Sequence, residues 1–397
     1  MASRFLVFVF ILFALPTIVF AGAKERVAAL APKGMVFVMD KNGNELIAQN
    51  SDKKFVPASV AKTVTAWLAM ETLGGDYHFK TQFYLSKDRV LYVRGGGDPF
   101  LISEELAILA PQLLAVTGKE AFSGMVIDAS YYPKDLQIPG IEKDDESYNA
   151  LNTALAVNFN TIHARRKGKT VTSAEKQTPI TPMAISQFRK RGPNGRGRIS
   201  LAQEDPAISL IYAGELIAAF ISKEGGEVKG RIIVGSVPDG LEPVYVHEQS
   251  RPLSDLLTQM LLGSNNYMAN QIFLEVGARQ LGGSVSLEKS LKVANDLLAK
   301  NGLGDAIELE EGSGISSGNQ FTPRGLAKVL DLFENNAELL KKTKAGSRYK
   351  TGTLSTVSTL AGYAETKKNG RVRFVIALPG RTGKLRFRIL SLLEKEL

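Results

Sequence analysis

The chain has 397 residues, of which 44% are hydrophobic and 22% are charged, so it is long enough for two domains with a sizeable core. It contains no cysteine, which excludes disulfides, thiolate nucleophiles and cysteine-based zinc sites. Its three histidines do not have the spacing of an HExxH motif, so we expect no metal site and no cofactor.

The N-terminus has the pattern of an export signal. Arg4 precedes an apolar run over residues 5–20, and small residues follow it. Signal cleavage after Ala21 and after Ala23 both fit this pattern. An uncleaved membrane anchor is the alternative, but the run is short for a membrane-spanning helix. We therefore expect residues 1–23 to be a signal peptide and the protein to be exported, to the periplasm or the cell envelope.

The formal net charge is +9, and basic residues form clusters at 165–169, 189–191, 196–198 and 341–344. Such clusters are usually solvated faces. The functional alternative is attraction to a polyanion, which for an exported protein is a membrane surface or an anionic wall polymer. The clusters lack the interleaved aromatic residues of single-strand binders, so we expect no nucleic-acid partner.

In chain order, residues 34–40 and 45–48 predict two short strands joined by Asn42-Gly43, a strong hairpin signal. A helix with a 3.6-residue apolar period begins at Ser59 and stops at the glycine pair 74–75. Residues 130–205 look mostly irregular. The other predicted elements are strands at 81–86, 89–94, 124–128, 154–159, 170–172, 231–235, 348–352, 359–365 and 371–377, and helices at 103–116, 206–222, 253–262, 266–281, 286–300, from 322 and from 382.

Ser59 and Lys62 open the first long helix. Backbone N–H groups and the helix dipole favour negative charge at Ser59, and Lys62 lies one turn further along the same face. A hydroxyl is a poor nucleophile until a base removes its proton, and a desolvated lysine can be that base. The Ser-x-x-Lys spacing occurs five times, but only this copy opens a long apolar helix. It predicts a serine nucleophile with a lysine base.

Two further motifs follow in the chain. Ser264 and Asn266 form a Ser-x-Asn motif at the start of a helix, and Lys350, Thr351 and Gly352 form the one Lys-Thr-Gly of the sequence. The glycine lets a ligand lie against the strand backbone. Together the three motifs match the SxxK, SxN and KTG set of penicillin-binding proteins and serine β-lactamases.

The resemblance extends beyond the motifs to one branch of these proteins. The sequence resembles the class C, penicillin-binding-protein-4-like D-Ala-D-Ala carboxypeptidases/endopeptidases over nearly the whole chain after the leader. About 200 residues separate Ser59 from Ser264, which suits the large insertion of that branch. The stretches that carry the resemblance are 91–99, 126–128, 263–269, 312–316 and 350–362.

This resemblance implies an α+β fold. A serine β-lactamase/transpeptidase-like domain, with an antiparallel sheet packed on helices, would be built from residues 24–80 and 245–397. A large inserted α/β domain would cover residues 81–244. Larger relatives nest a further domain inside the insertion, and we expect that extra domain to be reduced or missing here. We also expect the C-terminal helix to cover the sheet, with a membrane-surface role as the alternative.

The resemblance also implies catalytic roles. Ser59 would attack the D-Ala-D-Ala carbonyl with Lys62 as the base, which needs a neutral amine and so a lowered pKa that a nearby Lys350 would favour. Ser264 would relay a proton to the leaving amine. Asn266 would hold both Lys62 and the substrate amide.

Substrate binding is implied at two places. Backbone N–H groups of Ser59 and Thr353 would form the oxyanion hole, and Lys350, Thr351 and Thr353 would bind the terminal carboxylate along the strand opened by Gly352. Asp128 would contact the amino end of a diaminopimelate-type side chain. Its alternative is a turn or cap aspartate. Ser264 could likewise be only a helix cap, and Lys350 only a solvated edge lysine.

The leading hypothesis is an exported serine D-Ala-D-Ala carboxypeptidase/endopeptidase that trims peptidoglycan stem peptides and is acylated by β-lactams. A serine β-lactamase or esterase of the same fold is the first alternative. A non-catalytic cell-wall-binding protein is the second. The chain departs from its relatives at Ser316-Ser317, where Ser-Arg is usual, and at Glu311, where aspartate is common, so the side-chain specificity stays open.

Overall fold

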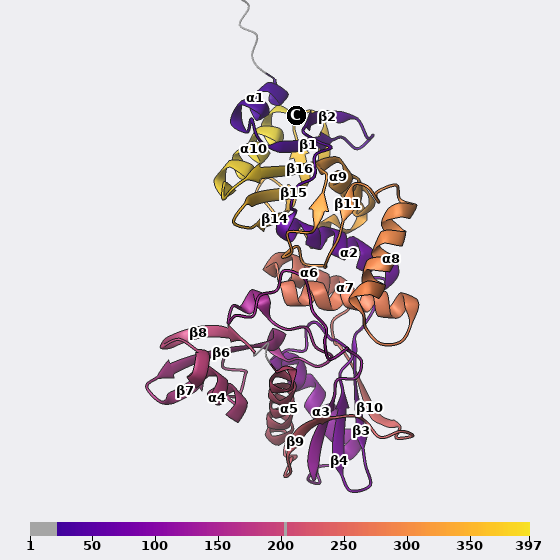
Figure 1. The fold of residues 1–397 in the computed structure, drawn as a ribbon, viewed down its shortest axis with the longest axis vertical. Helices are drawn as coiled ribbons and strands as arrows, with labels where there is room; N and C mark the ends of the chain where they lie inside the picture. Colours follow the sequence, from indigo (N-terminus) through magenta and orange to yellow (C-terminus); the bar gives the residue numbers. More distant parts are fainter. Residues whose placement is uncertain (1–21, 202–204) are drawn as a thin grey trace, which may run out of the picture.

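The computed structural model describes residues 22–201 and 205–397. A six-stranded sheet lies at one end of the molecule, a layer of helices lies in the middle, and a second unit with its own sheet forms the other end (Figure 1). The signal peptide expected over residues 1–23 lies outside the described residues except for Gly22 and Ala23. Ala23 is the first residue of helix α1 (Ala23–Leu30).

Both ends of the chain build one antiparallel sheet, in the strand order β13-β14-β15-β16-β1-β2. The predicted N-terminal hairpin is confirmed and pairs with the C-terminal strands through β1, where Met35 lies opposite Ala377. The strands are β1 (Met35–Met39), β2 (Glu45–Gln49), β13 (Lys341–Lys342), β14 (Arg348–Thr353), β15 (Val357–Thr366) and β16 (Gly370–Pro379). This is the sheet that the sequence predicted from the two chain ends.

Helices cover both faces of this sheet. Successive strand residues point to opposite sides, so alternate residues of one strand pack with different helices. Val36 and Val38 pack with α1 and the C-terminal helix α10 (Gly383–Glu396), whereas Phe37 and Met39 pack with the helices of the middle layer. The C-terminal helix therefore covers the sheet, as expected.

The middle layer is organised around α2 (Ala61–Thr72), which follows the 3₁₀ turn η1 (Ala58–Val60). Every residue of α2 from Ala61 to Ala69 is buried, so the helix lies in the core, enclosed by its neighbours. Predicted helices around it are confirmed to within a few residues. They are α6 (Leu253–Gly263), α7 (Asn266–Leu281), α8 (Leu287–Lys300) and α9 (Pro323–Leu332); the short strands β11 (Ile307–Glu308) and β12 (Gln320–Phe321) and the turn η4 (Glu334–Leu339) complete this part.

The insertion has a five-stranded sheet of order β10-β3-β4-β5-β9, with β4, β5 and β9 parallel. The strands of this sheet run from Lys80 to Glu248, because β10 pairs with β3. Helix α5 is apolar and long enough to cross a membrane, but half of it is buried here against α3 and the sheet. The elements are β3 (Lys80–Leu85), β4 (Val90–Arg94), α3 (Ser103–Thr117), β5 (Gly124–Asp128), α5 (Pro206–Lys223), β9 (Ile232–Gly235) and β10 (Pro243–Glu248).

A smaller unit is nested inside the insertion. Its sheet has the order β7-β6-β8, and one helix packs on it. The extra domain that the sequence analysis expected to be reduced or missing is therefore represented here by a small sheet and one helix. Its elements are β6 (Thr161–Lys167), β7 (Thr170–Ser173), α4 (Pro182–Arg191) and β8 (Gly195–Ser200), preceded by the turns η2 (Ser147–Asn149) and η3 (Asn158–Asn160).

The strand predicted near 154–159 is wrong. Asn158, Phe159 and Asn160 all have positive φ angles of 52–60°, which a strand cannot contain. Asparagine tolerates this left-handed conformation, and the Asn158 amide oxygen accepts a hydrogen bond from the backbone N–H of Ser103 (3.0 Å). The segment turns at this point because its asparagines are bonded to neighbouring elements.

Candidate active site

Ser59 lies in η1, the turn that leads into α2, and its side chain is only partly buried. The preceding residue, Ala58, has a φ of 50°, a left-handed conformation that costs an alanine about 1–2 kcal/mol. Strain of this kind is maintained where surrounding packing fixes the backbone. Lys62 follows one turn later, and its Nζ lies 3.1 Å from the Ser59 Oγ. The predicted Ser59–Lys62 pair therefore has hydrogen-bonding geometry.

The Lys62 amine is completely buried and has three partners. Besides Ser59, its Nζ lies 2.7 Å from the Asn266 Oδ1 and 2.7 Å from the backbone oxygen of Ser313. Both of these oxygens can only accept hydrogen bonds. A neutral amine has two N–H groups and one lone pair, so two donations to these oxygens turn the lone pair toward the Ser59 hydroxyl. The geometry suits a base.

The charge around Lys62 favours the same state. Burial lowers its pKa well below the ordinary value, the neighbouring Lys350 ammonium lowers it further, and the carboxylate of Glu311 acts in the opposite direction. Burial is thus the main cause, and the effect expected from Lys350 is the second.

Ser264 and Lys350 form a second serine–lysine pair, with the Lys350 Nζ 2.8 Å from the Ser264 Oγ and 3.0 Å from the Thr351 carbonyl oxygen. Ser264 joins α6 to α7 in a left-handed conformation, and the cap of α7 is Asn265, whose side chain accepts from the Met268 N–H. Ser264 is therefore not the N-cap of α7, which was its alternative role, but it is the C-cap residue of α6. Lys350 is buried rather than solvated, and burial followed by the charge of Arg386 lowers its pKa to about 8.

Gly352 brings strand β14 against the nucleophile. A Cβ at this position would lie 2.9 Å from the Ser59 backbone nitrogen and 2.7 Å from the Pro57 oxygen, closer than a side chain allows. The neighbouring strand is tied to the same turn, because the Thr359 hydroxyl donates to the Pro57 oxygen (2.8 Å). Thr351 is partly exposed and Thr353 exposed along this edge. A ligand can therefore lie beside Ser59 along the strand.

Glu311, which the sequence analysis treated only as a departure from its relatives, organises the loop that contacts Lys62. Its carboxylate is fully buried and accepts from the backbone N–H groups of Ser313 (2.7 Å) and Gly314 (2.6 Å) and from the Asn319 side chain (2.7 Å). These bonds fix the Ser313 carbonyl that accepts from Lys62. A carboxylate directly before the Gly312-Ser313-Gly314 turn is the sequence signal that could have indicated this role.

The insertion also reaches the site, which the sequence analysis missed. The Asn266 side-chain amide donates to the backbone oxygen of Tyr148 (3.2 Å), and Gly140 packs so closely on Ser316 that a Cβ there would lie 2.7 Å from its Cα. Tyr148 exposes 53% of its surface, and burial and then the nearby Glu146 carboxylate raise its pKa. The segment from Gly140 to Tyr148 therefore forms one rim of the site.

Asp128 does not fit its predicted role in substrate binding. Its side chain is fully buried at the end of β5, in the inserted sheet. One carboxylate oxygen accepts from Arg94 (3.0 Å) and the Val237 N–H (2.9 Å), and the other accepts from the Ser130 N–H (2.8 Å). These partners occupy both carboxylate oxygens and favour the alternative of a turn or cap aspartate.

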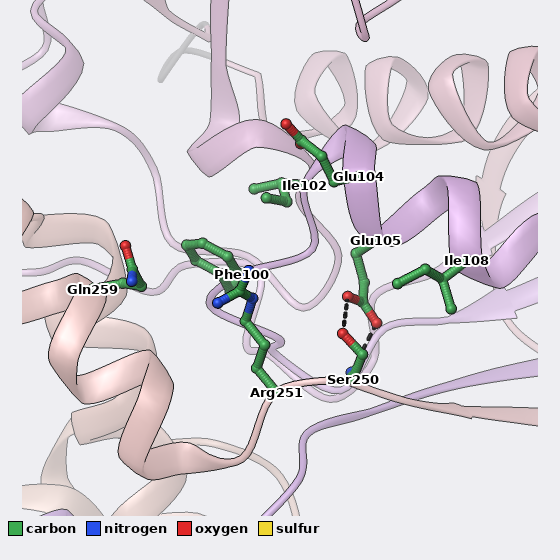
Figure 2. Close-up of a pocket in the computed structure, with 8 residues that line it drawn as sticks. All are labelled: Phe100, Ile102, Glu104, Glu105, Ile108, Ser250, Arg251 and Gln259. Carbon is green, nitrogen blue, oxygen red and sulfur yellow. Dashed lines mark hydrogen bonds between the residues drawn. The ribbon is translucent and has the colours of Figure 1, made fainter.

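A separate hollow of about 200 Å³ lies where the insertion meets α6, lined by the residues shown in Figure 2. The Glu105 carboxylate within it is occupied by hydrogen bonds from the Ser250 hydroxyl (2.6 Å) and backbone N–H (2.8 Å), and its Oε1 also lies 2.8 Å from His247. It contains none of the motif residues. Over residues 22–201 and 205–397, no group of His, Asp or Glu side chains is arranged to hold a metal ion.

An antiparallel sheet covered by helices on both faces, with two serine–lysine pairs beside a glycine-bearing strand, defines the class of penicillin-recognising serine enzymes. Sequence comparison defines the family. The chain matches, and belongs to, the D-Ala-D-Ala carboxypeptidase 3 (S13) family, over residues 28–194 and 194–343. It is therefore a serine-type D-Ala-D-Ala carboxypeptidase, and as a member of a family of cell-wall enzymes it belongs to the cell envelope.

Individual relatives agree with this assignment. The chain is 24% identical to a D-alanyl-D-alanine carboxypeptidase from Actinomadura sp., over 89% of this chain and 78% of that protein. The structure of penicillin binding protein 4 (dacB) from Haemophilus influenzae has a TM-score of 0.76 at 20% identity, covering 95% of this chain and all of the other. The same protein complexed with a novel β-lactam has a TM-score of 0.70 at 20% identity, with the same coverage. These structures share the fold.

Proposed function

We propose that the protein trims the stem peptides of peptidoglycan through an acyl-enzyme on Ser59. The observation that carries this proposal is the arrangement around Lys62, whose amine donates to Asn266 and to the Ser313 carbonyl and faces the Ser59 hydroxyl with its remaining position. Lys62 takes the hydroxyl proton as the Ser59 Oγ attacks the carbonyl carbon between the two D-alanines. The serine ester forms, and terminal D-alanine leaves.

Ser264 and Lys350 serve the departing amine and the carboxylate. The leaving nitrogen needs a proton, and the Ser264 hydroxyl, bonded to Lys350, can deliver one and recover it from the lysine. The backbone N–H groups of Ser59 and Thr353 form the oxyanion hole for the tetrahedral intermediate. The proton that Lys62 took from Ser59 replaces the one that Lys350 gave up, so Lys62 is neutral again. Water then attacks the ester with Lys62 as the base, and the proton passes to the Ser59 oxygen as the acid product leaves.

The terminal carboxylate of the substrate binds along β14. The Thr351 and Thr353 hydroxyls and the Lys350 ammonium lie on the edge that Gly352 opens toward Ser59. A β-lactam carries a carboxylate and a strained amide in a comparable relation, so it acylates the same serine. The complex of the Haemophilus influenzae relative with a β-lactam supports this.

We further propose that the protein is exported to the periplasm by the leader at residues 1–23 and meets anionic material there. The basic cluster at 341–344 includes exposed lysines on β13 at the edge of the six-stranded sheet. Such a surface suits a peripheral contact with membrane lipids or an anionic wall polymer.

The first test is labelling of the purified protein, without its leader, by a fluorescent penicillin, alongside Ser59→Ala. We expect a long-lived covalent adduct on the wild type and none on the variant, together with release of D-alanine from a D-Ala-D-Ala peptide. Rapid penicillin turnover without D-alanine release would instead indicate a β-lactamase. A folded wild type with neither activity would leave only wall binding and contradict the proposal.

A further inference from the structure

Arg386 is a buried arginine directly behind the carboxylate edge of the site. It comes from α10, the C-terminal helix, and lies on the helix face that is otherwise apolar, with Ile389, Leu390 and Leu393 at the following buried positions. Only 9% of its surface is exposed. A charged side chain on the buried face of a helix needs partners. The hydrogen-bond acceptors of Arg386 are all on the strands of the active site, and its guanidinium also lies 5.5 Å from the ring centre of Phe387 on α10.

One nitrogen of the guanidinium joins the two strands. The Nη1 of Arg386 lies 2.6 Å from the Gly352 oxygen, 2.9 Å from the Thr359 oxygen and 3.1 Å from the Thr353 Oγ1. Gly352 and Thr359 are opposite each other in the β14–β15 ladder. The two hydrogens of Nη1 are therefore shared among three oxygens, two of which belong to the Lys-Thr-Gly-Thr edge.

These contacts decide where the hydroxyl proton of Thr353 can go. An arginine only donates hydrogen bonds, so the Thr353 Oγ1 uses a lone pair toward Nη1 and keeps its own proton for another acceptor. That acceptor is now the Gly352 oxygen at 2.8 Å. Because Nη1 already satisfies this oxygen, the hydroxyl can turn its proton to an incoming anion without leaving the buried carbonyl unpaired.

The positive charge of Arg386 also lacks a counter-ion. Within residues 22–201 and 205–397 no carboxylate forms an ion pair with it, and its buried Nε has no hydrogen-bond partner there. Burying an unpaired cation is costly. The cost has a function if the missing anion is the ligand, and the same charge contributes to the lowered pKa of Lys350, after burial.

We propose that Arg386 is a positioning residue of the carboxylate subsite, which holds the Thr353 hydroxyl as a donor to the terminal carboxylate of the substrate and supplies the uncompensated charge behind it. The inference depends on the proposed function, because the carboxylate is that of a peptide ending in D-Ala-D-Ala. It adds a residue that is distant in sequence from the three motifs, on a helix whose other role is to cover the sheet.

The test compares a D-Ala-D-Ala peptide with the same peptide bearing a C-terminal carboxamide, in Arg386→Met, Arg386→Lys and Thr353→Val. In Arg386→Met we expect KM for the free-acid peptide to rise about 10–100-fold with kcat changed less than about threefold, as for a lost charged hydrogen bond. The carboxamide peptide, which lacks the anion, should be nearly unaffected. Arg386→Lys keeps the charge and should recover part of the preference for the free acid.

A double variant shows whether Arg386 acts through Thr353. If it does, Arg386→Met added to Thr353→Val raises KM much less than it does alone. The matched control is Arg373→Met, since Arg373 is a buried arginine of the same sheet that pairs with Glu334 and donates to the Asp40 oxygen. We expect Arg373→Met to lower the unfolding temperature and leave the ratio between the two peptides unchanged.

Equal losses on both peptides, or additive effects in the double variant, would show that Arg386 only supports the fold and would overturn the proposal. If Arg386→Met does not fold, the result for Arg386→Lys decides. If Arg386→Lys has the KM of the wild type and prefers the free-acid peptide as strongly as the wild type does, the guanidinium is not needed and the proposal is contradicted. Penicillin labelling of the wild type separates a failure of the proposed function from a failure of the role of Arg386. An unlabelled wild type without D-alanine release refutes the proposed function itself, whereas a labelled wild type with unchanged peptide ratios in the variants refutes only the role of Arg386.

Discussion

The two buried lysines of the site are chemically identical but are held in different surroundings. Lys62 has two carbonyl-type acceptors and the nucleophile around its amine, and an anion, Glu311, lies within electrostatic range. Lys350 has a serine hydroxyl and its neighbour's carbonyl oxygen, and the charge that acts on it is a cation, Arg386. Burial lowers the pKa of both, but Lys62 faces a serine whose proton it must remove, whereas Lys350 faces a serine to which it returns a proton.

The partners of a lysine, more than its burial, therefore separate a base from a carboxylate-binding group. The pKa of Lys350, about 8, leaves it mostly protonated at neutral pH, as a group that binds an anion and resupplies a proton must be. Lys62 has its pKa lowered well below the usual value and is the group that can be neutral. The substitutions Lys62→Met, Lys350→Arg and Glu311→Gln each change one of the two lysines or a group that acts on it.

The largest effect is expected for Lys62→Met, which removes the base and keeps the side-chain volume similar. Acylation by penicillin and D-alanine release should fall by at least about 10³-fold, within the range for loss of general base catalysis. The variant should unfold at the same or a higher temperature, because it no longer buries an amine that water would protonate. Stopped-flow acylation and calorimetry measure the two quantities. Acylation that persists near the wild-type rate would remove Lys62 from the mechanism.

The same substitution should change how stability depends on pH. A lysine with a lowered pKa in the folded state binds fewer protons there than when unfolded, so the free energy of unfolding rises with pH between the two pKa values. Lys62→Met should flatten this rise below pH 10.5, the value for the free side chain. Denaturant titrations at a series of pH values test this. An unaltered slope would mean that Lys62 keeps its proton in the folded protein.

The pH profile of kcat/KM should separate the two lysines. The rate should rise with pH as Lys62 becomes neutral and fall above about pH 8 as Lys350 loses its charge, by about tenfold per pH unit at the alkaline end. In Lys350→Arg, the charge persists at all these pH values, so the alkaline fall should disappear while the acid side stays in place. If the alkaline fall remains in Lys350→Arg, another group is responsible for it.

A smaller change is expected for Glu311→Gln, which acts on the Lys62 side alone. The carboxylate raises the pKa of Lys62, so its removal should move the acid side of the profile to lower pH and leave the alkaline side near 8. The glutamine amide replaces a buried carboxylate that accepts hydrogen bonds from several N–H groups, so the free energy of unfolding should fall by about 1–3 kcal/mol. A fall in rate without any movement of the acid side would show that Glu311 only supports the loop.

The sequence was sufficient for the Ser59–Lys62 pair and for the motif residues Ser264 and Lys350, because local patterns identify their helices and strand, but the bond between Ser264 and Lys350 appears only in the structure. The sequence could not indicate Arg386, whose partners lie 27 to 34 residues away on strands that only folding brings beneath α10. It could not indicate the Tyr148 carbonyl either, because backbone contacts carry no residue signature. In the nested sheet β7 was predicted, but β6 and β8 were missed because both are rich in arginine and β8 also contains glycine, which together hide the strand pattern.

Asp128 is the predicted substrate-binding residue whose contacts favour a structural role, and we expect it to give the smallest effect on activity. Like the two lysines, Asp128 is a buried titratable group. Its partners are Arg94 and two backbone N–H groups inside the insertion. These bonds lower its pKa against the opposing effect of burial, so the stability that it contributes is present at neutral pH and is lost as the pH falls through its pKa. Asp128→Asn should lower the free energy of unfolding by about 1–3 kcal/mol and leave KM for peptides with charged or acetylated side-chain amines within about twofold. A selective loss for the charged-amine peptide would return Asp128 to the substrate site.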